Sequence, residues 1–327
     1  MEFYTNKQVV VTGGAGFVGG HLCELLSNHG AFVTVLDTMS RTSMSKYPPP
    51  LSPYIHSYPV DCGDAEAMRP FLRDVDIVFN LAADVAGVIH NADNNADMFA
   101  SNVRLQTAPV FAAAEAGVKH FLQVSSVCVY SPSLNHPALE SHGHTGEPHR
   151  ANMGYAWAKR MGERVAGWQL DSFEKMVIVR PSNVYGPRDW FDDKAHVVPA
   201  LIKKIYEGES DYKITLHGSG SEIRELVYVK DTARAMAYAL AYGASGEAYN
   251  IGSGYTTTIM HLAEDLVKVM VGVIDNEIEI HTTPAAESGD PLRWCDFSKL
   301  KEIGWTPKYT SPTHNLRKTV DYFRREK

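Results

Sequence analysis

The feature that most constrains the fold is a glycine-rich turn near the start of the chain. Residues 9–22 read VVVTGGAGFVGGHL, in which Gly13, Gly16 and Gly19 separate an apolar run from an amphipathic segment. Glycines at these places let the backbone turn tightly and approach a pyrophosphate, whose charge is favoured at the start of a helix. We therefore expect a strand, a phosphate-binding turn and a helix in that order, which is typical of dinucleotide-binding folds.

The first half of the chain continues this alternation of short apolar runs and helix-length segments. Buried strands are predicted over 8–12, 32–36, 77–81, 120–125 and 176–179, and helices over 16–29, 94–116 and 197–206. Strand, helix and strand in this order imply right-handed crossovers and a parallel sheet. We expect an α/β fold, a Rossmann-type doubly wound parallel sheet with a smaller C-terminal α/β substrate-binding lobe. The predicted division is 1–178 for the dinucleotide-binding domain, with 226–254 returning to it, and 179–225 and 255–327 for the lobe.

Charge and cysteine content narrow the class of protein. The net charge of −7, with no dense run of Lys and Arg, argues against a nucleic-acid partner. There is no signal-like start and no apolar run of about 18 residues, so we expect a cytoplasmic protein without a membrane partner. Four scattered cysteines without a CxxC pair predict neither a disulfide framework nor a zinc site. The His-rich segment 131–150 is expected to be a surface loop, and no metal is predicted.

Three places beyond the turn could meet a dinucleotide. Asp37 ends the second predicted strand, where a carboxylate accepts hydrogen bonds from an adenosine ribose and repels a 2′-phosphate. This favours NAD over NADP, although the nearby Arg41 weakens the preference. Asp61 and Cys62 follow a strand-like stretch and could meet the adenine, and residues 80–83 (NLAA) end a strand in small side chains. Strand-end packing is the alternative explanation for each taken singly.

Tyr155 and Lys159, in the stretch GYAWAK, lie one helical turn apart and share a face. An ammonium beside a phenol stabilises the phenolate, so we expect Lys159 to lower the pKa of Tyr155 toward working pH. The pattern YxxxK is common by chance. Its position on a helix after the fourth strand, beyond SSVCVY, makes it informative.

Together these motifs resemble the extended short-chain dehydrogenase/reductase family over essentially the whole chain. TGGAGFVG, NLAA, SSVCVY, YAWAK, RPSNVYGP and NIGSG stand in the order that the family uses. The resemblance implies the family's fold and its Ser-Tyr-Lys chemistry. Ser126 matches the family's serine, Tyr155 its acid/base, and Lys159 the lysine that holds the ribose. Family members usually dimerise through two helices each, so a homodimer through the helices at 94–116 and 155–171 is expected.

Within the family the chain most resembles GDP-mannose 3,5-epimerases and GDP-L-fucose synthases. Both groups carry a cysteine two residues after the serine, the place of Cys128, and the synthases have a histidine where His196 begins HVVPALI. Inverting a sugar carbon beside a ketone requires one group to remove a proton and another to return one to the opposite face. A thiolate and an imidazolium suit this exchange. Cys128 as a core filler and His196 as a helix cap are the alternatives.

The resemblance also implies groups for the substrate and the cofactor. Arg224 resembles an arginine near the diphosphate in both groups, and Arg293 resembles one in the epimerases that could clamp the same phosphates. Surface ion pairs are the alternative for both. The predicted substrate-binding residues are Val85, Ser126, Cys128, Asn183, His196, Val197, Lys204, Arg224 and Arg293. The predicted cofactor-binding residues are Gly13, Gly16, Phe17, Val18, Asp37, Arg41, Asp61, Cys62, Leu81, Ala82, Ala83, Asn102, Val124, Tyr155, Lys159, Pro181, Asn183 and Val184.

The resemblance implies an NAD-dependent nucleotide-sugar epimerase, with a GDP-sugar as the favoured substrate. Carbon 4 would be oxidised transiently, and carbon 3, carbon 5 or both would be inverted. The predicted catalytic residues are Ser126, Cys128, Tyr155, Lys159 and His196. Alternatives are an NADPH-dependent 4-keto-6-deoxy nucleotide-sugar epimerase/reductase, a simple 4-epimerase, and a nucleotide-sensing protein without activity. The intact Ser126, Tyr155 and Lys159 argue against the last.

Overall fold

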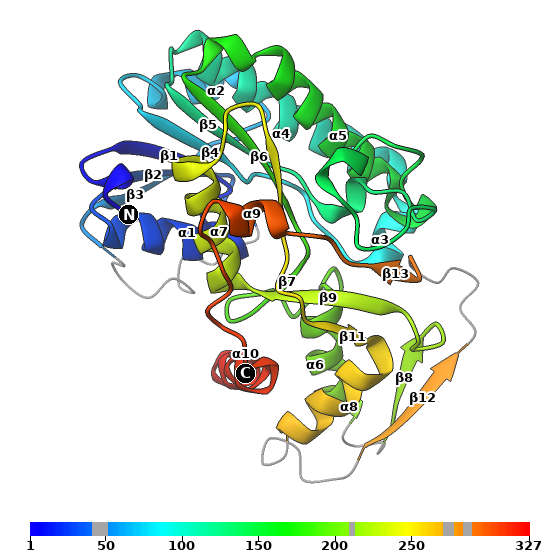
Figure 1. Cartoon of the computed structure of the whole chain (residues 1–327). Helices are drawn as coiled ribbons and strands as arrows, with labels where there is room; N and C mark the ends of the chain where they lie inside the picture. Colours follow the sequence, from blue (N-terminus) through cyan, green and yellow to red (C-terminus); the bar gives the residue numbers. More distant parts are fainter. Residues whose placement is uncertain (41–51, 209–212, 271–277, 284–289) are drawn as a thin grey trace.

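The structure is a computed structural model that describes residues 1–40, 52–208, 213–270, 278–283 and 290–327. A large sheet with helices on both faces lies above a smaller lobe that contains the C-terminal helix (Figure 1). Arg41, a predicted cofactor contact, lies outside the described residues.

The large sheet has seven parallel strands in the order β10-β6-β5-β4-β1-β2-β3. Their bounds are β1 Gln8–Thr12, β2 Phe32–Asp37, β3 Ile55–Pro59, β4 Ile77–Asn80, β5 His120–Val124, β6 Lys175–Pro181 and β10 Ala248–Ile251. The strand order runs outward from β1 in both directions, so a topological switch point lies between β1 and β4. Open α/β sheets bind their ligands at this point, at the carboxyl ends of the strands. The predicted Rossmann-type sheet is confirmed.

Helices cover both faces of this sheet, and for this reason its strands are almost continuously apolar. Helices α1 and α7 pack on one face, and α2, α4 and α5 on the other. Their bounds are α1 Phe17–Asn28, α2 Ala65–Met68, α4 Asn95–Glu115, α5 Met153–Trp168 and α7 Val229–Tyr242. Val9 and Val11 belong to the core on the first face, whereas Val10 belongs to the core on the second. Both faces of β1 are therefore buried.

The smaller lobe contains two further sheets and its own core. Strands β11, β9 and β13 are neighbours in one sheet, with β7 also paired to β9, and β12 pairs with β8. The strand bounds are β7 Asn183–Tyr185, β8 Lys213–His217, β9 Ile223–Tyr228, β11 Thr256–Thr258, β12 Glu279–Thr283 and β13 Leu292–Arg293. The remaining helices are α3 Val88–Asp93, α6 Val197–Glu207, α8 Ile259–Met270, α9 Ser298–Glu302 and α10 Pro312–Glu326. Side chains of α6, α8 and α10, such as Ile202, Leu266 and Phe323, form the lobe's core.

The chain crosses between the two parts at places that differ slightly from the predicted ones. Strand β6 continues the large sheet to Pro181 rather than ending at 178. Residues 226–228 belong to β9 in the second lobe, and the return to the large sheet begins with α7 at Val229. Helix α9 also packs on β10, so part of the C-terminal segment supports the large sheet. These crossings follow hydrogen-bonded strand pairing, which apolar patterns along the sequence do not reveal.

The segment 131–150 is partly buried, whereas the sequence predicted a surface loop. Ala138 is fully buried, and its backbone N–H donates to the carbonyl of Trp294. The backbone N–H of Asn250 donates to the carboxylate of Glu140. Buried backbone groups need such partners, and here the segment and the C-terminal part of the chain supply them to each other. Within the described residues, no group of three or more His, Cys, Asp or Glu side chains is arranged to hold a metal ion.

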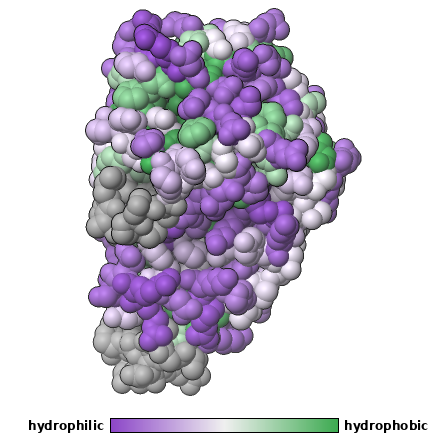
Figure 2. All heavy atoms as spheres, turned by 90° about the vertical axis from the view of Figure 1, so that its left-hand side faces the viewer, coloured by the Kyte–Doolittle hydropathy of each residue, from purple (hydrophilic) through white to green (hydrophobic). Residues whose placement is uncertain are grey.

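The face on the left of Figure 1 is mainly hydrophilic, with hydrophobic residues scattered among polar ones (Figure 2). Among the helices of the described ranges, none combines the length and the apolar character that crossing a membrane requires.

Candidate active site

A cavity of about 1330 Å³ lies where the carboxyl ends of the large sheet's strands meet the smaller lobe. Pockets for a single ligand are usually about 300 to 1000 Å³, so this one has room for two. Most of the predicted site residues line it: Gly13, Gly16, Phe17, Val18, Asp37, Cys62, Leu81, Ala82, Ala83, Val85, Val124, Ser126, Cys128, Tyr155, Lys159, Pro181, Asn183, Val184, His196, Val197, Lys204, Arg224 and Arg293. The structure thus brings together residues that are spread over nearly the whole chain.

The glycine-rich turn forms one wall of the cavity. Gly13 has φ +65°, and a Cβ there would lie 2.9 Å from the backbone N and Cα of Ala82. Gly16 is the N-cap of α1 and donates its N–H to the carbonyl of Gly13. Thr12 fixes the neighbouring strand end, because its hydroxyl accepts hydrogen bonds from the backbone N–H groups of Leu81 and Ala82. This cradle without side chains, at the N-terminus of a long helix, fits a pyrophosphate.

Asp37 lies at the carboxyl end of β2 and also lines the cavity. Its two carboxylate oxygens accept hydrogen bonds from the backbone N–H groups of Ala15 and Met39, at 3.2 and 2.9 Å. Burial raises the pKa of this carboxyl group, and the two hydrogen bonds oppose the change. Each oxygen keeps a further lone pair. The carboxylate is therefore held rigidly and can still accept a bond from a ribose hydroxyl.

Two predicted cofactor contacts lie outside the cavity lining. Asp61 accepts a hydrogen bond from Arg104 at 2.8 Å and another from the backbone of Gly63. Asn102 is fully buried, and its side chain exchanges hydrogen bonds with the backbone N–H and carbonyl of Asp84. The Asn102 amide holds the cavity-lining loop that begins at Asp84, and its direct contact with the cofactor stays a prediction.

Tyr155 and Lys159 lie on α5, as predicted, and both line the cavity. The Lys159 ammonium is 5.5 Å from the centre of the Tyr155 ring and donates to the carbonyl of Val124 and to Gln106 Oε1. Burial lowers the pKa of Lys159 to about 7. Burial also raises the pKa of Tyr155, and the charge of Cys128 adds to this. The expected lowering of the tyrosine pKa is not found, because burial of the phenol and the charge of Cys128 both act in the opposite direction.

Ser126 and Cys128 follow β5 on the short 3-10 helix Val127–Val129. Ser126 is its N-cap, and the serine hydroxyl accepts a hydrogen bond from the backbone N–H of Cys128 at 3.1 Å. Cys128 is a free thiol at the cavity wall and is partly exposed. The guanidinium Nη1 of Arg293 lies 3.3 Å from its sulfur. The core-filler explanation does not describe this position.

The predicted phosphate-binding cations have different surroundings. Arg293 is buried, and its Nε also lies 3.4 Å from Asp290, so its contacts are with the thiol and an acid rather than with open space. Lys204 donates to the carbonyl of Thr215 at 2.7 Å, and burial lowers its pKa. Arg224 donates to the carbonyl of Ile223, and burial together with the charge of Arg293 lowers its pKa to about 10.

His196 is the N-cap of α6 and forms no side-chain capping hydrogen bond. Its side chain is exposed and lines the cavity. The loop before it is tied to the loop after β4, because the backbone N–H of Gly87 donates to the carbonyl of Lys194 at 2.9 Å. A Cβ at Gly87 would lie 2.7 Å from the carbonyl oxygen of Ala195. The two loops therefore enclose one side of the cavity together.

Several cavity-lining polar residues were missed from the sequence: Asp84, Asn152, Asp189, Glu222 and Asp290. Two of them could have been predicted from their spacing to a predicted site residue. Glu222 lies two residues before Arg224, so strand alternation places both on one face. Asp290 lies three residues before Arg293 and contacts it. The others had no signal of this kind.

The fold and the site define a dinucleotide-binding enzyme of the Rossmann type, with a serine, a tyrosine and a lysine around a cavity for two ligands. Residues 9–252 match the model of the NAD dependent epimerase/dehydratase family. The chain belongs to this family.

Relatives with known names support the assignment. The chain is 31% identical to GDP-L-fucose synthase 1 of Arabidopsis thaliana, over 97% of this chain and 93% of the relative. Its structure resembles UDP-glucose 4-epimerase of Thermotoga maritima with UDP-glucose, with a TM-score of 0.85, 28% identity and coverage of 98% and 99% of the two chains. It also resembles UDP-glucose 4-epimerase of Thermus thermophilus in complex with NAD, with a TM-score of 0.82, 26% identity and coverage of 97% and 99%. These relatives are nucleotide-sugar enzymes, and this chain is an enzyme of the same epimerase/dehydratase family.

Proposed function

We propose that the chain is an NAD-dependent epimerase of a nucleotide sugar, with a GDP-sugar as the favoured substrate. The observation that carries this proposal is that Cys128 and His196 line the same cavity as Tyr155 and Lys159. Two groups that exchange protons with the ring carbons and two that assist the oxidation at carbon 4 would then act on one bound sugar.

Each residue around the proposed reaction centre has a separate role. The glycine cradle at Gly13 and the Asp37 carboxylate would hold NAD, which when bound accepts and returns a hydride at carbon 4 of the sugar. Tyr155 takes the proton of the carbon 4 hydroxyl, and Ser126 orients that oxygen. Lys159 holds the ribose and stabilises the tyrosine oxygen. Because burial alone raises the pKa of Tyr155, its deprotonation depends on positive charge gathered beside it.

Cys128 and His196 carry the inversion. A ketone at carbon 4 acidifies the hydrogens on carbons 3 and 5. The sulfur of Cys128 removes one of these hydrogens as a proton, the C–H electrons move into an enolate, and the protonated imidazole of His196 returns a proton to the other face. Each group changes its protonation once, so the site is reset by an exchange of protons with solvent.

The preference for NAD rests on Asp37. A carboxylate at the end of β2 repels the 2′-phosphate of NADP. In Asp37→Ser we expect the ratio of kcat/KM for NADP to that for NAD to rise by about 10- to 100-fold, since the repulsion of one charge pair is removed. An unchanged ratio would show that another residue selects the cofactor.

The alternative is an NADPH-dependent epimerase/reductase acting on a 4-keto-6-deoxy nucleotide sugar. It is favoured by the 31% identity to GDP-L-fucose synthase 1 of Arabidopsis thaliana. Steady loss of NADPH absorbance with such a substrate would identify it, whereas the epimerase shows no net consumption of the dinucleotide.

The epimerase proposal is tested by incubating the enzyme with GDP-sugars in deuterated water. We expect deuterium at carbon 3 or carbon 5, read by mass spectrometry and NMR, and none with Tyr155→Phe. Cys128→Ala should abolish exchange while the bound dinucleotide is still reduced by the sugar. If turnover occurs without any ring deuterium, the proposed inversion is wrong and a simple 4-epimerase is favoured.

We also propose that the chain works in the cytoplasm as a homodimer. A reducing compartment keeps thiols free, and all four cysteines are free thiols. Helices α4 and α5 pack on each other, and Phe99 and Phe111 of α4 are partly exposed at 38% and 42%. Sedimentation of the wild type and of Phe111→Glu tests this pairing.

A further inference from the structure

We propose that Arg293 holds Cys128 as a thiolate, and that it is a positioning residue for the proton-abstracting base. The inference deepens the proposed function, because only its catalytic consequence rests on Cys128 acting as the base.

The contact between these residues is built by distant parts of the chain. Arg293 Nη1 lies 3.3 Å from Cys128 Sγ, and the two residues are 165 positions apart. The arginine side chain is 11% exposed, and its Nε is directed by Asp290. A guanidinium with fixed geometry beside a sulfur favours the thiolate, which is the reactive form of cysteine. Partial burial strengthens the interaction, because solvent screens it less.

Other elements around the sulfur also contribute positive charge. Lys159 of α5, Arg224 of β9 and Arg293 of β13 interact electrostatically with Cys128, whereas the phenol of Tyr155 contributes no positive charge. The acids near these cations are Glu163 beside Lys159, Glu222 beside Arg224, and Asp290 beside both arginines. Only Arg293 has a hydrogen-bonding distance to the sulfur among the described contacts.

The two arginines of the cavity can therefore be assigned different tasks. Arg293 and Arg224 are register partners on β13 and β9. Arg293 donates to the sulfur of Cys128 and to the carboxylate of Asp290. Arg224 donates to the neighbouring backbone carbonyl of Ile223. Among the described contacts only Arg293 touches the base, whereas both arginines line the cavity that would take the diphosphate.

The pairing has a consequence for the proton-transfer step. When Cys128 takes a proton from the carbon beside the ketone, an S–H bond forms and a C–H bond breaks, and the negative charge moves from sulfur to the enolate oxygen. Arg293 stabilises the negative charge on sulfur at the start of this step. Replacing Arg293 therefore lowers the fraction of enzyme in which Cys128 is a thiolate. The effect appears in kcat more than in KM.

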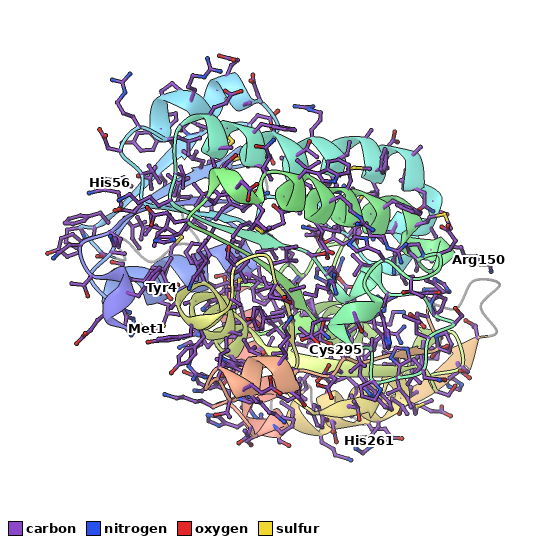
Figure 3. All side chains as sticks on the ribbon, turned by 45° about the horizontal axis from the view of Figure 1, so that its top comes forward. Met1, Tyr4, His56, Arg150, His261 and Cys295 are labelled. Carbon is purple, nitrogen blue, oxygen red and sulfur yellow. The ribbon has the colours of Figure 1, made fainter. Side chains whose placement is uncertain are left out.

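Alkylation of the free enzyme with iodoacetamide measures the thiolate directly. The other three thiols are poor targets, since Cys23, Cys62 and Cys295 are buried and burial raises their pKa, for Cys62 to about 12. Cys295 lies in the interior of the molecule (Figure 3). Peptide mapping by mass spectrometry confirms which thiol reacts.

In Arg293→Gln we expect alkylation of Cys128 at pH 7 to slow by about 10-fold, and the midpoint of its pH profile to rise by about one unit, since one pH unit corresponds to a tenfold change in thiolate. Arg293→Lys should stay within about 3-fold of the wild type, because it keeps the charge. Arg69→Gln, which removes an exposed arginine outside the cavity, is the matched control and should not change the profile. A profile of Arg293→Gln that superimposes on the wild type would overturn the proposal.

A second measurement does not depend on an arginine variant folding. A thiolate favoured in the folded state adds stability as pH rises through the range in which a thiol in the unfolded chain remains protonated. The melting temperature of the wild type, relative to that of Cys128→Ser, should therefore increase from pH 6 to pH 9. Two parallel curves would contradict the thiolate pairing.

These experiments are independent of turnover. If no deuterium enters the sugar but the alkylation profile shifts as expected, the proposed function fails and the arginine–thiolate pair stands. If deuterium enters the sugar but the alkylation profile does not shift, the proposed function stands and the arginine–thiolate pair is wrong.

Discussion

Arg224 and Arg293 stand opposite each other on the neighbouring parallel strands β9 and β13, yet their guanidinium groups have different surroundings. Arg293 is placed between the sulfur of Cys128 and the carboxylate of Asp290. Burial and the positive charge of Arg293 together lower the pKa of Arg224 to about 10. An anion bound at Arg224 would relieve this repulsion, as the proposed binding of a substrate diphosphate there requires.

Arg224→Met should therefore weaken substrate binding. A charge-assisted hydrogen bond is worth about 1.5 to 3 kcal/mol, so we expect KM to rise by about 10- to 100-fold with kcat nearly unchanged. Steady-state kinetics with the nucleotide sugar measure both constants. Arg224→Lys serves as the conservative comparison and should recover part of the loss. A fall in kcat at constant KM would instead place Arg224 in the chemical step.

Gly13→Ala should impair both stability and dinucleotide binding. The position combines a left-handed φ of +65° with a close approach to the backbone of Ala82, so the added methyl group needs the strand ends to move apart. We expect the Kd for NAD to rise by at least about 10-fold, equal to about 1.4 kcal/mol, measured by calorimetry.

Gly117→Ala is the matched control, because Gly117 has φ +72° and no heavy atom within 4 Å of the added Cβ. It should cost only the conformational strain of about 1 to 2 kcal/mol in urea unfolding, and the Kd for NAD should not change. Equal effects of the two substitutions on Kd would show that contact with Ala82 is irrelevant.

Lys159 should make stability depend on pH in a defined direction. Its pKa is lowered to about 7 by burial, whereas in the unfolded chain it is about 10.4, so between these values the unfolded state binds more protons. Stability gains from this lysine as pH rises from 7 to 10, and the cost of its buried charge is greatest below pH 7. Relative to the wild type, Lys159→Met should have its highest melting temperature at pH 6, and the difference should shrink by pH 9.

The comparison for Lys159 is Lys268→Met. Lys268 is 70% exposed, so its replacement should shift the melting temperature by a similar small amount at every pH. A difference for Lys159→Met that does not vary with pH would contradict the buried charge.

Glu163→Gln should destabilise the protein strongly. Burial raises the pKa of Glu163, but its ion pair with the buried Arg180 outweighs this and lowers the value to about 2. The substitution leaves the guanidinium without its countercharge, at a cost of about 3 to 5 kcal/mol in urea unfolding.

The same pair fixes the pH dependence of that loss. The stability from Glu163 is fully present above about pH 4.3, the value in the unfolded chain, and is lost as pH falls through about 2. The difference between wild type and Glu163→Gln should be constant from pH 5 to 8 and shrink in acid. The double variant Glu163→Leu with Arg180→Met should recover part of the stability, and a failure to do so would point to a loss of packing instead.

The parts of the fold that could be predicted from the sequence are those encoded locally. The turn at Gly13, the carboxylate of Asp37 and the one-turn spacing of Tyr155 and Lys159 each follow from a short stretch of chain. All of these residues line the cavity. The boundaries of β1 matched and those of α1 lay within one residue of the predicted ones, because glycine, apolar periodicity and strand length coincide there.

The parts that could not be predicted depend on contacts between distant residues. The pairing of Cys128 with Arg293 arises only because β13 lies beside β9, and no local pattern encodes that register. The pKa of Tyr155 was expected to fall because of its neighbour, yet burial of the phenol and the charge of Cys128 raise it. The hydrogen bond from the Asp84 backbone to Asn102 likewise joins residues that no local pattern connects.

The repeated crossing of the chain between its two parts has a consequence for engineering. The large sheet takes β6 from before the smaller lobe and β10 from between the two stretches that form this lobe, and α9 supports β10 from still further along. A nucleotide pocket from a relative therefore cannot be transplanted as one contiguous block. Such a chimera must exchange at least two separate stretches, 182–228 and 252–297, and leave the intervening helix and strand with their original host.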